Sequence, residues 1–335
     1  MIKFRIRRQY IPMMRVTILM PTFNRCMVLR ETLEAMCGID RKGIDCEFVV
    51  IDNNSNDCTP TVVSEYKERL PLTLLKEPRP GKNCALNKAL TEYPLGDIVV
   101  FTDDDVTPDR NWLREIVSSA QRWQDICVFG GRIEVKWPND QQPEWAAADW
   151  IQAIGYSRHD LGDKEKRYTP PPRPFGPNFW VRKTVFEKVP FFDETIGPHP
   201  TERIMGSETS FLRTVEKAGF GMLYCPSAMV QHRILPKECA IAALRRRGYR
   251  FGRGQVRLRG WHRRETYARN KLFWLMVLLA DYVYTSARYV IGAARRDLRR
   301  NCEITVDSMI RFGSLYQTFK EFKASLKRPG QSAPA

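Results

Sequence analysis

The fold follows from the stretch Asp97-Ile-Val-Val-Phe-Thr-Asp-Asp-Asp-Val106, in which an apolar run ends in three consecutive carboxylates. The four apolar residues are typical of a strand that is buried on both faces. Three adjacent carboxylates repel one another, and a divalent cation among them would relieve that repulsion. Side chains alternate along an extended chain, so Asp103 and Asp105 should share a face while Asp104 points away. A solvated acidic turn that caps a helix is the other interpretation of the triplet taken alone.

Strand and helix signals alternate through the N-terminal half of the chain. Strands are expected at 16–20, 47–51, 72–75 and 98–101, and helices at 29–36, 59–69 and 81–93. Acidic and amide residues repeatedly follow the end of a strand. When parallel strands are joined by crossover helices, their carboxyl ends lie at one edge of the sheet, and ligands bind there. We therefore expect an α/β fold with a mostly parallel sheet, flanking helices and a binding site at that edge.

Positive charge is concentrated toward the C-terminus. The net charge of the chain is +16, and residues 236–335 hold 22 Lys and Arg against 7 Asp and Glu, which leaves the preceding residues nearly neutral. This distribution predicts a near-neutral body followed by a basic tail, residues 236–335, that has its own role. Residues 1–14 form a short basic extension without the apolar segment of a secretory signal.

The cysteines point to a reducing compartment. There are 9 of them, an odd number, scattered along the chain and without a CxxC pair. This pattern argues against a disulfide scaffold. Together with the N-terminus, it predicts a cytoplasmic location.

Seven short motifs in the body carry a resemblance to a known family. They are Pro21-Thr-Phe-Asn-Arg25, Asp52-Asn-Asn-Ser-Asn-Asp57, Gly81-Lys-Asn-Cys-Ala-Leu-Asn87, Phe101-Thr-Asp-Asp-Asp105, Phe175-Gly-Pro-Asn178, Gly206-Ser-Glu-Thr209 and Tyr224-Cys-Pro-Ser-Ala-Met-Val-Gln-His232. In this order the chain resembles the family 2 glycosyltransferases, inverting enzymes with the GT-A fold. The resemblance covers residues 15–235, which we expect to form a GT-A domain ahead of the basic tail.

The resemblance implies a nucleotide-sugar site. Its residues would be Pro21, Thr22, Asn24, Arg25, Asp52, Asn54, Lys82, Asp103, Asp104, Gly176 and Asn178. Asp52 matches the carboxylate that accepts a hydrogen bond from the uracil imide N–H, and this match favours UDP over GDP or dTDP. The other interpretation of Asp52 is an Asx turn. The other interpretation of Arg25 and Lys82 is ordinary solvated surface charge.

The resemblance also implies a metal and a general base. Asp105 and His232 match ligands of a cation, Mn²⁺ or Mg²⁺, that neutralises the leaving diphosphate, and an imidazole ligand favours Mn²⁺. A structural role is the other interpretation of His232. The family's Glu-Asp pair is Glu208-Thr209 here, and threonine is no base near neutral pH. Either Glu208 is the base or another carboxylate reaches the site, and a glutamate that complements a helix dipole is the alternative.

The basic tail suggests contact with a membrane surface. Its arginine-rich segment precedes an uncharged apolar run at 272–280, whereas a spanning helix needs about 20 such residues. A helix lying on anionic headgroups fits this length better, as a peripheral contact at the inner face of the cell membrane. Packing of this helix on the catalytic domain is the alternative.

The expected activity is transfer of a sugar from a nucleoside diphosphate donor to a polysaccharide or lipid-linked glycan. A nucleic-acid-binding protein would explain the arginines, with Tyr249, Phe251 and Trp261 as stacking residues, but not the ordered acidic motifs. A sugar-nucleotide nucleotidyltransferase shares the metal carboxylates but has a glycine-rich, lysine-containing loop where this chain has Pro21-Thr-Phe-Asn-Arg25. A non-catalytic glycan-binding relative is a further alternative because of Thr209.

Overall fold

A computed structural model describes residues 14–169, 171–199, 202–258 and 271–326. The predicted basic extension 1–14 therefore lies almost entirely outside the described residues, as does Trp261. The strands are β1 (Arg15–Thr22), β2 (Asp45–Asp52), β3 (Leu72–Lys76), β4 (Ile98–Thr102), β5 (Val106–Pro108), β6 (Val128–Lys136), β7 (Lys166–Arg167), β8 (Asn178–Arg182) and β9 (Met222–Arg233). The α-helices are α1 (Cys26–Cys37), α2 (Thr59–Glu65), α3 (Lys82–Glu92), α4 (Trp112–Arg122), α5 (Asp149–Tyr156), α6 (Ser207–Lys217), α7 (Ile241–Leu258), α9 (Lys271–Ala293) and α10 (Leu298–Leu326). Short 3₁₀ helices are η1 (Pro138–Asp140), η2 (Glu144–Ala146), η3 (Lys183–Glu187) and η4 (Pro236–Glu238).

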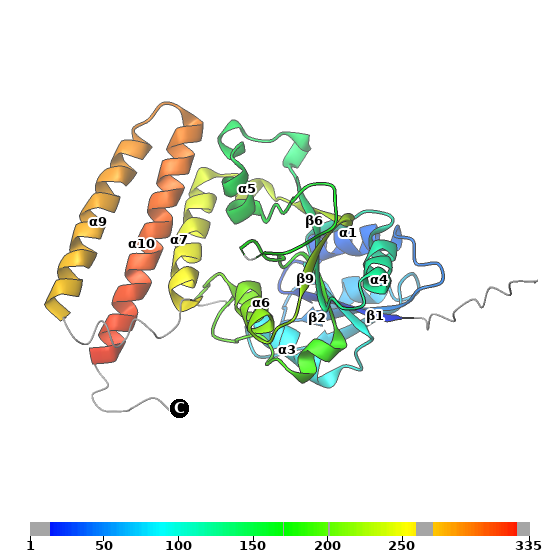
Figure 1. The fold of residues 1–335 in the computed structure, drawn as a ribbon. Helices are drawn as coiled ribbons and strands as arrows, with labels where there is room; N and C mark the ends of the chain where they lie inside the picture. The colour runs from blue at the N-terminus through cyan, green and yellow to red at the C-terminus, as the bar shows by residue number, and fades with distance from the viewer. Residues whose placement is uncertain (1–13, 170, 200–201, 259–270, 327–335) are drawn as a thin grey trace, which may run out of the picture.

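The strands form one sheet in the order β3-β2-β1-β4-β8-β6-β9-β5, with β7 paired to β9 (Figure 1). Strands β1 to β4 pair in parallel, as the alternation of strand and helix signals predicts. Beyond them, β8 runs antiparallel to both β4 and β6, while β6 and β9 are parallel. The α/β prediction is confirmed, and the sheet is parallel in its first half and mixed in its second.

Helices cover both faces of the sheet because its central strands are apolar on both sides. In β1, Ile18 packs in a cluster with residues of α1, α2 and α4, whereas Leu19 packs in a cluster with residues of α3 and α6. The apolar residues of β4 are at most 2% exposed. Such double-sided burial is what a continuous apolar run predicts for a parallel strand. The register pairs Thr22 with Asp52, so the carboxyl ends of β1 and β2 lie side by side.

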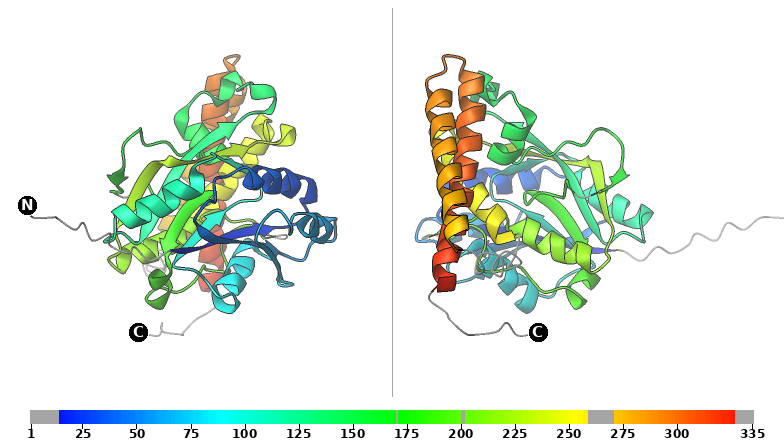
Figure 2. Two further views of the ribbon diagram at one scale, coloured as in Figure 1. Left: turned by 90° about the vertical axis from the view of Figure 1, so that its right-hand side faces the viewer. Right: turned by 60° about the vertical axis from the view of Figure 1, so that its left-hand side comes forward.

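The C-terminal helices pack on the body through α7. Figure 1 shows α7 beside the body, α10 next to it and α9 outermost, and Figure 2 shows α9 and α10 side by side on one outer face. α7 and α10 come very close, because a Cβ on Gly252 would lie 1.8 Å from the Ile310 carbonyl oxygen and one on Gly313 would lie 1.9 Å from the Tyr249 carbonyl oxygen. In the part of the chain that the structure describes, no helix is long and apolar enough to span a membrane.

One pair of cysteines departs from the expectation of free thiols. Cys26, at the start of α1, is disulfide-bonded to Cys58, which directly precedes α2. The other described cysteines are free. Sequence spacing does not reveal this bond, because the two residues come together only when the loops after β1 and β2 meet.

Candidate active site

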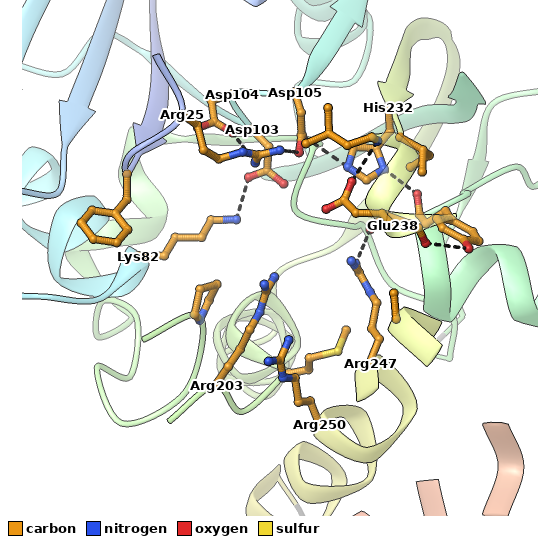
Figure 3. A pocket seen from close by; sticks show the side chains of 18 of the residues that line it. Arg25, Lys82, Asp103, Asp104, Asp105, Arg203, His232, Glu238, Arg247 and Arg250 are labelled. Carbon is orange, nitrogen blue, oxygen red and sulfur yellow. Dashed lines mark hydrogen bonds and ion pairs between the residues drawn. The ribbon is translucent and has the colours of Figure 1, made fainter. Parts of the chain in front are cut away.

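A cavity of about 590 Å³ opens at the carboxyl edge of the sheet. Its lining includes, from the strand edge, Pro21, Thr22, Arg25, Lys82, Asp103, Asp104, Asp105 and His232. Its lining also includes, from the C-terminal side, Arg203, Glu238, Arg246, Arg247 and Arg250. Figure 3 shows the carboxylates on one side of the cavity and Arg203, Arg247 and Arg250 on the other. Residues before and after position 235 thus line one cavity, so the expected boundary between domain and tail passes through it.

The acidic triplet is not a continuation of β4. The strand ends at Thr102 and a turn follows, so the alternation of side chains stops before the carboxylates. The predicted alternation, with Asp104 on the face opposite to Asp103 and Asp105, is wrong, since all three line the cavity. Asp104 accepts hydrogen bonds from Thr22 Oγ1 at 2.6 Å and Arg25 Nη1 at 2.7 Å. Arg25 Nη2 also lies 2.9 Å from Asp105 Oδ2, so one guanidinium bridges two buried carboxylates.

The two bridged carboxylates differ in acidity. Burial raises the pKa of Asp104 to about 7, although the charge of Arg25 opposes this shift. Burial also acts to raise the pKa of Asp105, but the charges of His232 and Arg25 outweigh it and hold that pKa well below its usual range. Negative charge is therefore held mainly at Asp105, where a cation would bind.

Asp105 and His232 fit the expected metal site. His232 Nε2 lies 3.3 Å from Asp105 Oδ1, a buried oxygen without a hydrogen bond to the described residues. His232 Nδ1 contacts the Tyr156 carbonyl oxygen at 2.7 Å, which leaves Nε2 facing the carboxylate. One imidazole and one carboxylate suit Mn²⁺. Among the described residues no group of three His, Cys, Asp or Glu side chains could hold a metal, so substrate oxygens would have to complete the coordination.

Lys82 connects the acidic triplet to Glu208. Its ammonium lies 2.7 Å from Asp103 Oδ1 and 2.9 Å from Glu208 Oε1. Burial acts to raise the pKa of Glu208, but the charge of Lys82 outweighs it and lowers that pKa. Gly176 makes room for this arrangement, because a Cβ there would lie 2.4 Å from Glu208 Oε1. Glu208 is thus ionised and lies behind Lys82, outside the cavity lining.

The predicted nucleoside-binding residues form a connected pair of loops. Asp52 Oδ1 accepts a hydrogen bond from the backbone N–H of Ser55, three residues further along the chain, at 2.9 Å, so this oxygen is bound within its own loop. Asn24 Oδ1 accepts one from the Asn56 N–H at 2.8 Å, and Asn24 and Asn54 both have positive φ angles. Asp52, Asn24 and Asn54 lie next to the cavity lining rather than in it.

Asn178 lies in the core and not at the site. It is fully buried, and its Oδ1 accepts a hydrogen bond from Trp112 Nε1 at 2.9 Å. Its Nδ2 donates to the carbonyl oxygens of Arg132 and Ala228. These bonds join β8 to α4, β6 and β9, so we remove Asn178 from the candidate site.

The cavity wall that α7 provides was not predicted from the sequence. Arg246 and Arg250 lie four residues apart and therefore share one face of a helix. That spacing was visible in the sequence, but nothing in it tells which face of α7 meets the body. Arg203 had no signal, because it lies in an irregular segment before α6.

Comparisons with known proteins agree with this architecture. The profile of the family described as "Glycosyl transferase family 2" matches residues 17–189. The chain is 25% identical over 220 residues to a probable glycosyltransferase, YdaM, of Bacillus subtilis, covering 64% of this chain and 50% of YdaM. It is 22% identical over 299 residues to the glycosyltransferase AglE of Haloferax volcanii, covering 88% of each. A glucosyl-dolichyl phosphate glucuronosyltransferase of the same organism is 25% identical over 66% of this chain and 70% of its own.

A solved structure shares the fold. The mannosyltransferase PcManGT from Pyrobaculum calidifontis, solved in complex with GDP-Man and Mn²⁺, superimposes with a TM-score of 0.58 over 93% of this chain and 89% of its own, at 19% identity. The match to the family profile spans more than half of the chain and includes the loops after β1, β2 and β4 that build the strand-edge wall. The resemblance seen in the sequence is confirmed: this chain belongs to glycosyl transferase family 2 and has the GT-A fold.

Proposed function

We propose that this glycosyltransferase moves a hexose from a nucleoside diphosphate sugar, with UDP favoured, to a hydroxyl of a polysaccharide or lipid-linked glycan, with inversion at the anomeric carbon. The observation that carries the proposal is the strand-edge wall of the cavity. There Arg25 and Lys82, two cations suited to a diphosphate, lie beside Asp105 and His232, a donor pair suited to a divalent metal. The metal, when bound, would help to neutralise the charge of the leaving diphosphate.

The residues of the chain have separable roles in this reaction. Arg25 and Lys82 bind the diphosphate oxygens, and the loops that contain Asn24 and Asp52 hold the nucleoside. Glu208 takes the proton of the acceptor hydroxyl as its oxygen attacks the anomeric carbon and the bond from that carbon to the diphosphate oxygen breaks. For Glu208 to do so, Lys82 must leave its carboxylate, and a bound diphosphate offers Lys82 another anion.

The acceptor side of the proposal has separate support. The name of one relative includes a glucosyl-dolichyl phosphate, a lipid-linked sugar. On this chain α9 leaves large apolar side chains exposed, among them Phe273, Met276, Leu279, Val283 and Ile291. The neighbouring Arg295 and Arg296 are exposed too, and this combination suits an anionic membrane surface. We propose that α9 lies on such a surface at the cytoplasmic face and that the acceptor reaches the enzyme there.

The alternative functions have less support. A nucleic-acid-binding tail would use the arginines of α7, but two of these serve packing, since Arg245 donates to Thr305 and Asn301 and Arg253 donates to Gln317, and such a tail does not account for the strand-edge wall. A nucleotidyltransferase would release pyrophosphate from a nucleoside triphosphate, which a coupled assay detects.

A calorimetric titration tests the donor site. Purified protein is titrated with UDP, GDP and dTDP, each with and without Mn²⁺, beside Asp105→Ala and the control Asp109→Ala, which alters a partly exposed carboxylate four residues away. We expect UDP to bind more tightly than GDP and dTDP, and to bind in a metal-dependent way. This dependence on Mn²⁺ should persist in Asp109→Ala and disappear in Asp105→Ala. Absence of binding by all three nucleotides would overturn the proposal.

A further inference from the structure

Three arginines of the cavity have no side-chain partner among the described residues. Arg203, Arg246 and Arg250 all line the cavity, and none makes a hydrogen bond, ion pair or ring contact through its side chain with the described residues. Figure 3 shows Arg203 and Arg250 extending into the cavity from the side opposite the acidic triplet. Arg246 and Arg250 are one helical turn apart on α7.

The other arginines of α7 differ in this respect. The side chain of Arg245 is bound by α10, that of Arg247 by the Ile154 carbonyl oxygen and Ser157, and that of Arg253 by Gln317. These contacts hold α7 to its neighbours. Arg246 and Arg250 contribute nothing of that kind, so packing does not explain them.

The three unpartnered cations also repel one another. Burial lowers the pKa of Arg250, and the charges of Arg203 and Arg246 lower it further. None of the described carboxylates that line the cavity forms an ion pair with these arginines, and Glu208, whose pKa the charge of Arg203 helps to lower, is itself bound by Lys82. Asp103 is bound by Lys82, Asp104 and Asp105 are bound by Arg25, and Glu238 accepts a hydrogen bond from the Leu235 N–H at 3.0 Å. A ligand anion between the three guanidinium groups would relieve it.

The diphosphate of the donor has its own subsite, away from the three unpartnered arginines. In the proposed function it lies against Arg25 and Lys82 at the strand edge, next to Asp105 and His232. The unpartnered arginines are on the far wall, and two of them, Arg246 and Arg250, are on α7, which packs against α10, the neighbour of α9. A second anion of the reaction is the phosphate that joins a glycan to its lipid.

We propose that Arg203, Arg246 and Arg250 form a subsite for a phosphate group of the acceptor, separate from the diphosphate subsite of the donor. This inference rests on the proposed function and specifies its acceptor as an anionic, phosphate-linked lipid. Guanidinium groups suit the task because each can donate two parallel hydrogen bonds to a phosphate.

The test separates the two phosphate subsites by using a minimal acceptor probe. First, calorimetry measures the binding of the preferred nucleoside diphosphate with Mn²⁺ to the wild type, to the double variant Arg246→Gln/Arg250→Gln and to Arg25→Gln. Second, decyl phosphate is titrated into each protein already saturated with that nucleotide, beside decanol and inorganic phosphate. The control Lys42→Gln/Arg110→Gln removes two exposed cations outside the cavity and outside α9.

We expect the wild type to bind decyl phosphate in the presence of the nucleotide, and the Arg246→Gln/Arg250→Gln variant to bind it at least about tenfold more weakly. The nucleotide affinity of this variant should stay within about twofold of the wild type. Arg25→Gln should bind the nucleotide more weakly but, once saturated with it, bind decyl phosphate as the wild type does. Competition by inorganic phosphate, but not decanol, would identify the headgroup as the recognised part.

Two outcomes would overturn the inference. One is that decyl phosphate competes with the nucleotide, or that the double variant loses nucleotide affinity as Arg25→Gln does, because the arginines then serve the donor. The other is equal binding of decyl phosphate by all proteins. A wild type that binds nucleotide but not decyl phosphate refutes this inference alone, whereas one that binds no nucleotide refutes the proposed function.

Discussion

The ammonium of Lys82 lies 2.9 Å from the carboxylate of Glu208, between the proposed base and the acidic triplet. Lys82 also contacts Asp103 at 2.7 Å, so it is bound by two carboxylates. A base that is paired with a lysine cannot take a proton efficiently, because the lysine lowers its basicity. In the proposed function, Lys82 therefore has to leave Glu208 for a phosphate before Glu208 can act as the base.

Replacing Glu208 with Gln should abolish sugar transfer and leave nucleotide binding intact. Glutamine keeps the size of the side chain but cannot accept a proton, and a general base contributes about 10²–10⁴ to the rate. Transfer rates and calorimetric affinities measure the two effects. The matched control is Glu238→Gln, which alters a glutamate that lines the cavity. If Glu238→Gln stops the reaction and Glu208→Gln does not, Glu238 is the base.

Replacing Lys82 with Met should move the acid limb of the pH profile to higher pH. The charge of Lys82 lowers the pKa of Glu208 against the effect of burial, so its removal raises that pKa. The base must be ionised to act, and a higher pKa means that activity is lost at a higher pH as the pH falls. The pH at half-maximal kcat/KM reports this shift, with the exposed Lys183→Met as control. An unchanged acid limb would mean that Lys82 does not set the pKa of the catalytic base.

The parallel half of the fold could be predicted because its strands are marked by composition alone. The run Ile98 to Phe101 is apolar without interruption, since helices cover both faces of β4. The strands of the mixed half of the sheet are not uninterrupted apolar runs. β6 contains Gly130 and Gly131, where a Cβ would meet Tyr168 and the Ala228 carbonyl oxygen, so these glycines serve close packing inside a strand. A glycine pair in a sequence favours a turn, but here the strand continues through it, with a shift in the register of its pairing to β9 after Gly131.

The residues of the candidate site also fall into a part that the sequence predicts and a part that it does not. Residues that directly follow parallel strands, such as Arg25 and Asp105, could be predicted because topology brings those loops together. The wall formed by Arg246 and Arg250 could not, because a charge run gives no information on which face a helix buries. Asn178 was assigned to the site by its motif, and only the structure shows that its amide is fully used by Trp112 and backbone carbonyl groups.

Replacing Gly252 with Ala should destabilise the protein by about 1–3 kcal/mol, as overpacking does. The new Cβ would lie 1.8 Å from the Ile310 carbonyl oxygen, so α7 and α10 must move apart. Urea unfolding measures the change. Gly38→Ala is the control, because Gly38 has a φ of −82° and a Cβ there would lie 3.3 Å from its nearest neighbour. Equal stability of both variants would mean that the two helices can separate without cost.

The double variant Leu279→Asp/Val283→Asp should weaken binding to anionic vesicles. The two side chains are 63% and 59% exposed on α9. Moving a large apolar side chain out of water contributes about 1.5–3 kcal/mol when burial is complete, so we expect at least a roughly tenfold lower partition coefficient. Flotation with vesicles of phosphatidylglycerol and phosphatidylcholine measures it. Met27→Asp, at a 62% exposed residue of α1, should bind normally. Unaltered binding by the double variant would remove α9 from the membrane contact.

The buried His159 should make the protein less stable as the pH falls from about 6.5 to 4. Burial lowers the pKa of His159 to about 4, and its Nε2 lies 2.6 Å from the Tyr168 hydroxyl group. In this pH range the unfolded chain binds a proton at His159 that the folded chain does not, so acid favours unfolding. A shift of this size corresponds to about 3 kcal/mol.

Urea unfolding of the wild type and His159→Phe at pH 7 and pH 4.5 isolates this effect. Phenylalanine keeps an aromatic ring beside Tyr168 and Phe175 but cannot be protonated. The variant loses the hydrogen bond to Tyr168, so it should be less stable than the wild type at pH 7. Its further loss between pH 7 and pH 4.5 should be smaller than that of the wild type by about 2–3 kcal/mol, since only the wild type has a histidine to charge there. If both proteins lose the same stability over this range, His159 is protonated in the folded state near its ordinary pKa, and the acid sensitivity of the fold lies in its carboxylates.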